Sequence, residues 1–432
     1  MKTPIFFNSL QSLQIIQRRL FPTILVLLFT SIYMHGQVTE NGEKPMVLLA
    51  KAMIDVESGT TIRNPAIYIL NGKIEKIGDG LKIPDGFEII DISNKYIIPG
   101  LIDAHTHLCH EYRRDLDIVP GSNTIAETVL RSEGDRALLG AKNAREMLMA
   151  GFTTVRDLGN SGMGAAISLR NAINQGWAVG PRMFASTRAL SPIGGQFVTM
   201  TYEAQSAIIP KEYVAINGIE DARKAVRQAI YDGADCIKVI VNNNFLVLSQ
   251  EELNMIVEEA NRAGLKVAAH ATHGDGPSML AVKSGVNSIE HGYTISKEVL
   301  DIMANQGTYL VPTDRIGVRR YQQRIQRALQ AGVKIAFGSD KYYRHNELTR
   351  GQLAVRTYQS YKEAGMTNLQ ILQSATMHPG NLVSGKEKIG LIQSGYFADI
   401  IALDENPLEN IEALENVVFV MKEGEIVKNI TD

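Results

Sequence analysis

The chain has 432 residues, of which 45% are hydrophobic and 21% are charged. This composition is ordinary for a globular protein, and the length allows one large domain of about 250 residues together with a smaller one. The formal net charge is −2, and the sequence has no basic patch with interleaved aromatic residues. The composition therefore does not favour a nucleic acid as partner.

The N-terminal segment has the pattern of a targeting signal. Basic residues, Lys2, Arg18 and Arg19, precede an apolar run over residues 20–33. A basic start followed by a short apolar run is typical of a secretory signal, and this run is shorter than the roughly 18 residues of a membrane-spanning helix. We predict a signal peptide over residues 1–36, an exported protein that is periplasmic or secreted, and no stable membrane span in the mature chain. An uncleaved anchor helix is the alternative.

The two ends of the remaining chain share a β-rich pattern. Between residues 44 and 95, short runs rich in Ile and Val are separated by Asn-Gly, Gly-Asp-Gly and Pro-Asp-Gly turns. From about residue 385 onward, GLIQSGYFADIIALD and NVVFVMKEGEIVKN have the same pattern. We predict one small β-sandwich domain that is assembled from residues 37–97 and 385–432.

Eight apolar runs alternate with helical segments in the middle of the chain. The runs are GLIDAH, FTTVRD, RMFAS, DCIKVIV, KVAAHA, NSIEHG, TYLVPT and VKIAFGSD. Several helical segments end with a Gly, which adopts the left-handed conformation without steric cost. Eight successive strand–helix units predict an α/β fold, a (β/α)₈ TIM barrel over residues 98–384. A doubly wound open sheet is the alternative, although no GxGxxG or P-loop pattern supports it.

Side chains that can bind metal end several of these runs. His105 and His107 form an H-x-H pair at the end of the first run, where alternate side chains of a strand share a face. His270, His291 and Asp340 end the fifth, sixth and eighth runs. In a (β/α)₈ barrel the active site lies at the carboxyl ends of the strands, so these side chains are expected to meet there. Imidazole and carboxylate ligands suit Zn²⁺ and similar ions.

Lys238 lies inside the fourth apolar run, DCIKVIV. A charged ammonium is costly to bury, and burial lowers the pKa of a lysine. A neutral lysine amine can react with CO₂ to give a carbamate, a carboxylate-like ligand that can bridge two metals. Each of these six residues alone has a more ordinary explanation, such as a surface histidine, a lysine that reaches water or a helix cap. Their joint occurrence at strand ends favours a metal site.

These segments together resemble the metal-dependent amidohydrolase superfamily, and within it the branch of prolidase-like and imidazolonepropionase-like enzymes. The resemblance covers nearly the whole chain after the N-terminal segment, and PGLIDAHTHL is its most specific element. The other matching segments include AGFTTVRDLG, GADCIKVIV, VAAHATHG, GVNSIEHG, GVKIAFGSD and GYFADIIALDENPLENI.

The resemblance implies two divalent metal ions, with Zn²⁺ as the default, and a role for each ligand. The first metal would be held by His105, His107 and Asp340, and the second by His270 and His291. Lys238, as N6-carboxylysine, would bridge the two. Imidazolonepropionase-like enzymes hold one metal and lack the carbamate, so Lys238 counts against that assignment.

The chain departs from the prolidase-like pattern after the third strand. Relatives usually have Gly-Gly-His there, whereas this chain has Gly-Gly-Gln, ending at Gln196. Glutamine can form hydrogen bonds but cannot carry charge, which leaves the usual substrate of the branch in question. His273 could supply a ring instead, or could be a surface loop residue. Arg188 and Tyr342 are expected at the same rim, where an arginine could hold a substrate carboxylate. Further candidates at this rim are Arg315, Tyr343 and Arg344.

The hypothesis from the sequence is a hydrolase of the amide bond in a dipeptide, of the Xaa-Pro type, or in an N-acyl amino acid. A hydroxide bridging the two metals would attack the carbonyl, and Asp340 would carry its proton to the leaving nitrogen. One alternative is a hydrolase of cyclic amides or lactones, as in imidazolonepropionase-like enzymes. Another is a metal-binding relative that has lost catalysis. The expected partner is a small-molecule substrate.

Overall fold

The computed structural model describes residues 45–78 and 83–430. The predicted signal peptide, residues 1–36, lies outside the described residues. Among the described residues, no helix combines the length and the apolar character needed to cross a membrane.

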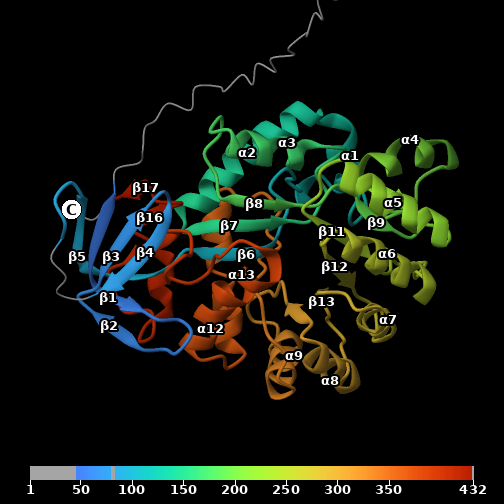
Figure 1. Ribbon diagram of the computed structural model, residues 1–432. Coiled ribbons are helices and arrows are strands. Elements are labelled where there is room, and N and C mark those ends of the chain that lie inside the picture. Colours follow the sequence, from blue (N-terminus) through green and yellow to red (C-terminus); the bar gives the residue numbers. More distant parts are fainter. Residues whose placement is uncertain (1–44, 79–82, 431–432) are drawn as a thin grey trace, which may run out of the picture. The chain divides into compact units, whose positions relative to one another are not determined.

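Both ends of the described chain contribute to one eight-stranded sheet (Figure 1). Its strand order is β17-β16-β15-β5-β1-β3-β4, and β2 pairs with β1. The long strand β5 joins the two halves, because it pairs in parallel with β1 and antiparallel with β15. The strands are β1 (Met46–Ile54), β2 (Thr61–Arg63), β3 (Ala66–Leu70), β4 (Lys73–Gly78), β5 (Glu88–Pro99), β15 (Ile400–Leu403), β16 (Phe419–Lys422) and β17 (Glu425–Asn429).

The turn chemistry explains why this sheet forms where the sequence predicts β structure. Asn71 and Gly72 connect β3 to β4 and have φ angles of 51° and 73°. Positive φ at both central residues is the geometry of the hairpin turn that Asn-Gly favours. The sheet thus brings together the two segments predicted to form one domain, while the sandwich arrangement and the boundaries 37–97 and 385–432 remain predictions.

Parallel strands occupy the middle of the chain. One sheet has the order β6-β7-β8, and a second has the order β10-β9-β11-β12-β13-β14. These strands are β6 (Leu101–Thr106), β7 (Phe152–Asp157), β8 (Arg182–Ala185), β9 (Ala189–Ser191), β10 (Tyr213–Ala215), β11 (Cys236–Ile240), β12 (Lys266–Ala271), β13 (Ser288–His291) and β14 (Tyr309–Val311). Seven of the eight predicted apolar runs thus contain a parallel strand, and β9 and β10 are two short strands that the sequence did not predict.

The eighth predicted run, VKIAFGSD, forms no regular strand but joins its neighbours through the backbone. On one side, Ile335 bridges to Leu310 of β14, and the Ala336 amide donates to the Leu310 carbonyl over 2.9 Å. On the other side, the Ala104 amide of β6 donates to the Phe337 carbonyl over 2.8 Å. The run therefore connects the end of the second parallel sheet with the beginning of the first.

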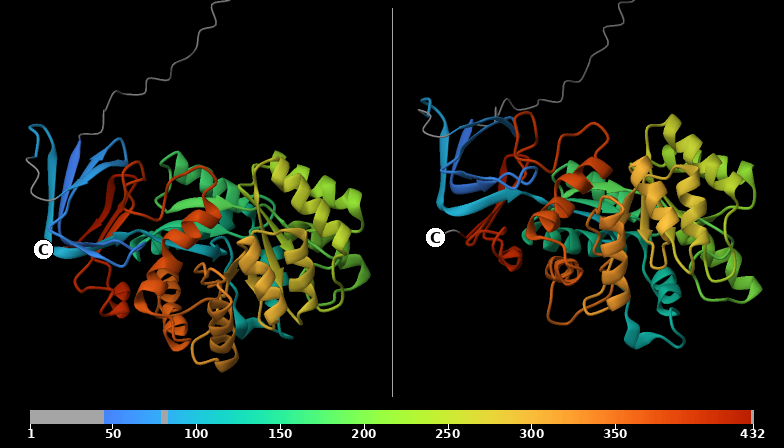
Figure 2. Two further views of the ribbon diagram at one scale, coloured as in Figure 1. Left: turned by 60° about the horizontal axis from the view of Figure 1, so that its bottom comes forward. Right: turned by 90° about the horizontal axis from the view of Figure 1, so that it is seen from below.

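Helices follow most of the parallel strands. Helices α5 to α8 pack against one another in chain order, on one side of the strands β11 to β13 (Figure 2). The helices are α1 (Asn123–Leu130), α2 (Glu133–Met149), α3 (Ala165–Asn174), α4 (Tyr202–Glu212), α5 (Ile219–Tyr231), α6 (Gln250–Arg262), α7 (Gly276–Ser284), α8 (Lys297–Gln306), α9 (Arg319–Gln330), α10 (Arg350–Val355), α11 (Tyr358–Glu363), α12 (Asn368–Ala375) and α13 (Met377–Val383).

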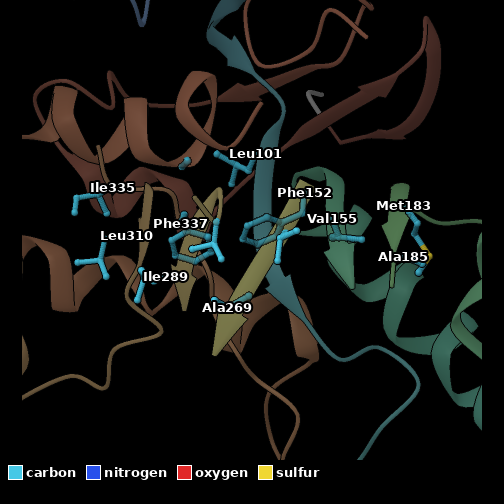
Figure 3. Close-up of a cluster of buried hydrophobic side chains, with 14 of the residues drawn as sticks. Leu101, Phe152, Val155, Met183, Ala185, Ala269, Ile289, Leu310, Ile335 and Phe337 are labelled. Carbon is cyan, nitrogen blue, oxygen red and sulfur yellow. The ribbon is translucent and has the colours of Figure 1, made fainter. Parts of the chain in front are cut away.

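One hydrophobic cluster lies among strands of both parallel sheets (Figure 3). The rings of Phe152 on β7 and Phe337 stack with centroids 5.8 Å apart. Both side chains are fully buried, and burying a side chain of this size contributes about 2 kcal/mol to stability. The other labelled members are Leu101, Val155, Met183, Ala185, Ala269, Ile289, Leu310 and Ile335. This packing joins strands of the two parallel sheets through one core.

Candidate metal centre

The six residues that the sequence assigned to a metal site all line one cavity of about 780 Å³. Their positions follow from the strands that carry them, since each lies within or just beyond the end of an apolar run. The six are His105 in β6, His107 just after it, Lys238 in β11, His270 in β12, His291 at the end of β13 and Asp340 at the end of the eighth run. The structure therefore brings together side chains that span more than half of the chain.

Asp340 lies among three of the histidines. Its Oδ1 is 3.3 Å from His107 Nε2 and 3.7 Å from His105 Nε2. Its Oδ2 is 4.0 Å from His291 Nδ1. Potential donor atoms of His105, His291 and Asp340 all lie within 4.8 Å of one another, which is close enough for metal ligands to share one site. The fourth ring, His270, packs against His291 with centroids 4.5 Å apart.

The backbone around Asp340 has the unusual conformation that this convergence requires. Asp340 and His291 have φ angles of 51° and 68°, a left-handed region that non-glycine residues rarely occupy. Gly338 permits the close approach of this segment to β6, because a Cβ there would lie 2.8 Å from the Cβ of His105 and 2.4 Å from a methyl group of Val311. Strained backbone of this kind clusters at functional sites.

Hydrogen bonds behind the rings orient three of the histidines. His105 Nδ1 donates to Glu290 Oε2 over 2.6 Å, and His107 Nδ1 donates to the Gly159 carbonyl over 2.7 Å. His291 Nδ1 lies 2.7 Å from the hydroxyl oxygen of Thr313, which itself donates to a backbone carbonyl. A proton on Nδ1 leaves Nε2 unprotonated. Metal-binding histidines are held by partners of this kind.

Sequence reasoning missed Glu290 and its partner Arg156. Arg156 Nη2 donates to Glu290 Oε1 over 2.8 Å, and both side chains are fully buried. Each is a charged residue inside an apolar run, NSIEHG or FTTVRD. That is the same signal that identified Lys238, so both could have been found from the sequence.

Burial controls the protonation of the ring nitrogens and of the lysine. Burial, together with the nearby Lys238, lowers the pKa of His105 to about 4. Burial also holds the pKa values of His270 and His291 well below their usual value, so these rings are neutral at pH 7. Burial lowers the pKa of Lys238 to about 8, which makes a neutral amine accessible.

The two carboxylates stay ionised in spite of their burial. Burial by itself would raise the pKa of Asp340, but His105 and His107 hold it well below its usual value. Burial would also raise the pKa of Glu290, but Arg156 and the hydrogen bond from His105 lower it to about 2. Neutral imidazoles, an ionised carboxylate and a lysine amine of lowered pKa fit divalent cations such as Zn²⁺.

Of the four residues Gln196, Tyr342, Arg188 and His273, which were expected to approach a substrate, two line the cavity and two do not. Gln196 and Tyr342 line the cavity, where Gln196 Nε2 lies 3.3 Å from His270 Nε2 and the Tyr342 ring meets the His107 ring at 5.6 Å. Arg188 and His273 are not among the residues that line it.

Local contacts explain where the side chains of Arg188 and His273 lie. The guanidinium of Arg188 donates to the Pro210 carbonyl in α4 over 2.7 Å, which turns it away from the cavity. His273 sits in a turn with a φ of 58°, and its Nδ1 lies 2.9 Å from the hydroxyl oxygen of Thr272. The cavity lining also includes Arg315, a further candidate from the sequence, and residues that sequence reasoning missed, namely Tyr112, Arg114, Asn160, Tyr213 and Tyr293.

Comparisons with known proteins agree with the geometry of the site. The model of the amidohydrolase family matches residues 96–427. Ochratoxinase of Aspergillus niger is 29% identical over 90% of this chain and 88% of its own, and an imidazolonepropionase of Caldanaerobacter subterraneus subsp. tengcongensis is 25% identical over 82% and 87%. The crystal structure of a Xaa-Pro dipeptidase with bound methionine is 31% identical, covers 89% of this chain and 100% of its own, and superposes with a TM-score of 0.76. The chain belongs to the amidohydrolase family and is a hydrolase that acts on amide carbon–nitrogen bonds.

Proposed function

We propose that this protein is an exported amidohydrolase with two divalent metal ions that cleaves the amide bond of a dipeptide, of the Xaa-Pro type, or of an N-acyl amino acid. The observation that carries the proposal is the convergence of four histidines, Asp340 and Lys238 on one cavity. No more ordinary role explains buried neutral imidazoles packed ring to ring around an ionised carboxylate.

The proposal divides the ligands between two metals. His105, His107 and Asp340 would hold the first, and His270 and His291 would hold the second. Lys238 would hold both as N6-carboxylysine, a product of its neutral amine and CO₂ that releases one proton. The burial of this lysine and its lowered pKa support the modification. The donor types favour Zn²⁺.

In the proposed reaction, the bound cations and the side chains of the protein have different roles. Bound divalent cations would polarise the substrate carbonyl and activate a water for attack. Asp340 Oδ1 and Oδ2 would accept the proton of that water and pass it to the leaving nitrogen, since the carboxylate is ionised and lies in the cavity. Glu290 and the Gly159 carbonyl would keep His105 and His107 in the tautomer that binds metal.

The (β/α)₈ barrel over residues 98–384 is part of the proposal. Backbone hydrogen bonds of the eighth run to both β14 and β6 support a closed ring of strands. The Asp235 amide, which precedes β11, donates to the Ala185 carbonyl of β8 over 2.9 Å and supports closure between the two parallel sheets. The active site then lies at the carboxyl ends of the strands.

Two substrate classes are compatible with the relatives. The names ochratoxinase and Xaa-Pro dipeptidase favour linear amides, whereas imidazolonepropionase favours a cyclic amide. The buried Lys238 in the same cavity as His270 favours the first class, because a bridging ligand is needed only where two metals are held. Export would follow from the N-terminal signal predicted from the sequence.

One experiment tests both the metal content and the substrate class. The purified protein would be analysed for bound metal and then assayed against Xaa-Pro dipeptides, N-acetyl amino acids, cyclic amides and lactones. We expect two divalent ions for each chain and turnover of a linear amide. A single metal with turnover of cyclic substrates alone would favour the alternative, and a metal-loaded protein that hydrolyses no member of the panel would refute the proposal.

A further inference from the structure

Tyr213, the first residue of β10, is a buried tyrosine in the wall of the cavity. Its side chain is 2% exposed, and its ring meets the ring of Phe197 edge to face, with centroids 5.2 Å apart. The segment before Gln196 lies directly over the ring, because a Cβ on Gly195 would come within 2.2 Å of a ring carbon. The ring therefore has one orientation, and only a glycine at position 195 allows it.

The hydroxyl oxygen of Tyr213 accepts a hydrogen bond, while its own proton is not donated to any described residue. Asn160 Nδ2 donates to it over 3.1 Å, and the backbone of Gln196 lies next to it. Within residues 45–78 and 83–430, no acceptor for the hydroxyl proton is found. Burial raises the pKa of Tyr213, so the proton is present at neutral pH. The tyrosine thus carries a polarised and unused O–H donor.

Two residues beside this hydroxyl, Asn160 and Gln196, also face the metal centre. Asn160 follows Gly159, whose carbonyl accepts the hydrogen bond from His107 Nδ1. The side chain of Gln196 lies 3.3 Å from His270 Nε2. Asn160, Gln196 and Tyr213 all line the cavity, and the bond from Asn160 places the Tyr213 hydroxyl at its wall. The donor therefore lies between the neighbours of His107 and of His270, which belong to different metals in the proposed function.

A buried ion pair fixes the beginning of β10. Glu212, directly before Tyr213, is 1% exposed and accepts a hydrogen bond from Arg136 in α2 over 2.6 Å. It also accepts from the Thr128 hydroxyl over 3.1 Å and from the Gly162 amide over 3.0 Å. Three separate segments thus hold the residue next to Tyr213, so the donor needs no reorganisation when a substrate binds.

We propose that Tyr213 is a catalytic residue whose hydroxyl donates a hydrogen bond to the oxygen of the scissile carbonyl. This inference rests on the proposed function. As water adds to the carbonyl carbon, the electron pair of the C=O bond moves to oxygen, and the donor stabilises the negative charge there without giving up its proton. A fixed donor stabilises the transition state more than the ground state, because charge on the oxygen develops only during the reaction.

The test compares two substitutions that each remove one buried hydroxyl. Tyr213→Phe removes the proposed donor and keeps the ring in its packing. Tyr68→Phe in β3 is the matched control, because Tyr68 is also 2% exposed, lies outside the cavity lining and finds no hydrogen-bond partner for its hydroxyl among the described residues. Both variants and the wild type would be loaded with Zn²⁺ and assayed on the best substrate among Xaa-Pro dipeptides and N-acetyl amino acids.

We expect Tyr213→Phe to lower kcat about 100-fold or more, the usual loss of one such donor, while KM changes little. A second readout is independent of turnover. The N-methylphosphonyl derivative of the released amino acid, which places tetrahedral oxygens at the reacting centre, should bind Tyr213→Phe at least about 10-fold more weakly. Metal content and thermal midpoint should equal those of the wild type. Asn160→Gly, which keeps the φ of 52° but removes the Nδ2 donor, should lower kcat by an intermediate amount.

The outcomes separate this inference from the proposed function. An active wild type with an equally active Tyr213→Phe would overturn the role of Tyr213 and leave the proposed function standing. A rise in KM alone would also overturn it, since the hydroxyl would then contact a part of the substrate away from the reacting carbonyl. A wild type that hydrolyses no amide in the panel would contradict the proposed function and, with it, this inference.

Discussion

His105 Nδ1 and Glu290 Oε2 are joined by a hydrogen bond of 2.6 Å, although their strands, β6 and β13, belong to different sheets. Both side chains are at most 1% exposed. Arg156 on β7 binds the other oxygen of Glu290 and so balances the charge of the carboxylate. The cavity therefore depends on residues behind its lining as well. The fully buried carboxylate of Glu290 sets the tautomer of His105, which lines the cavity.

Glu290→Gln should weaken metal binding about 10- to 100-fold, the usual cost of removing a partner of a metal-binding histidine. The amide keeps the size of the side chain but is a weaker acceptor for His105 and leaves Arg156 without its counter-charge. The measurement is the Zn²⁺ dissociation constant from competition with a chelator. Glu259→Gln in α6, which removes a carboxylate bound to Arg227 outside the cavity lining, is the control and should keep the wild-type affinity. Equal affinities in both variants would show that Glu290 does not position His105.

Lys238→Ala should lose bound metal and turnover, because the variant has no amine to form the bridging ligand. Added bicarbonate should not restore activity, whereas short carboxylic acids should restore part of it by entering the space that the side chain leaves. Metal content and kcat in the presence of each additive are the measurements. Lys297→Ala in α8 is the control, because Lys297 is an exposed residue paired with Asp301. Full metal content in Lys238→Ala would contradict the bridging role.

Asp340→Asn should keep much of the metal but lower kcat about 100-fold or more, since the amide cannot accept and return a proton. The side chain keeps its size, so the contacts with His105 and His107 should persist. Metal analysis and steady-state kinetics on the same preparation separate the two effects. Turnover near the wild-type value would mean that another group carries the proton.

Arg182→Met should lower the free energy of unfolding by about 3–5 kcal/mol, because it leaves Asp399 buried without its counter-charge. Arg182 in β8 binds Asp399 over 2.5 Å and Glu423 over 2.6 Å, and so connects the parallel strands with the sheet formed by both chain ends. Urea denaturation is the measurement. The double variant Arg182→Met/Asp399→Asn should regain part of the loss. A loss below about 1 kcal/mol, as for an exposed pair, would show that this contact contributes little.

Local sequence patterns predicted most of the parallel strands and all six candidate metal ligands. The apolar runs marked the parallel strands, and a polar residue at the end of a run marked a position in the cavity, as for His270 and Asp340. The eighth run was the exception, because it forms only an isolated bridge at Ile335 and ends at Asp340 in the left-handed region. A run of apolar residues does not show such a departure from a regular strand.

Other parts of the site depend on contacts between distant segments, which no local pattern contains. Tyr213 belongs to a three-residue strand, and its hydroxyl is held by Asn160, which is 53 residues away in the sequence. Arg188 was expected at the rim because it follows the third run, but a carbonyl of α4 takes up its guanidinium. Position after a strand therefore predicts nearness to the cavity, whereas the direction of a long side chain depends on the partners that it finds.

Anomalous diffraction at the zinc edge, from crystals of the Zn²⁺-loaded protein, tests the central claim most directly. We expect two peaks about 3.5–4 Å apart in the cavity, one beside His105, His107 and Asp340 and the other beside His270 and His291, with density for a carbamate on Lys238 between them. No peak in this cavity, or metal bound only elsewhere, would contradict it.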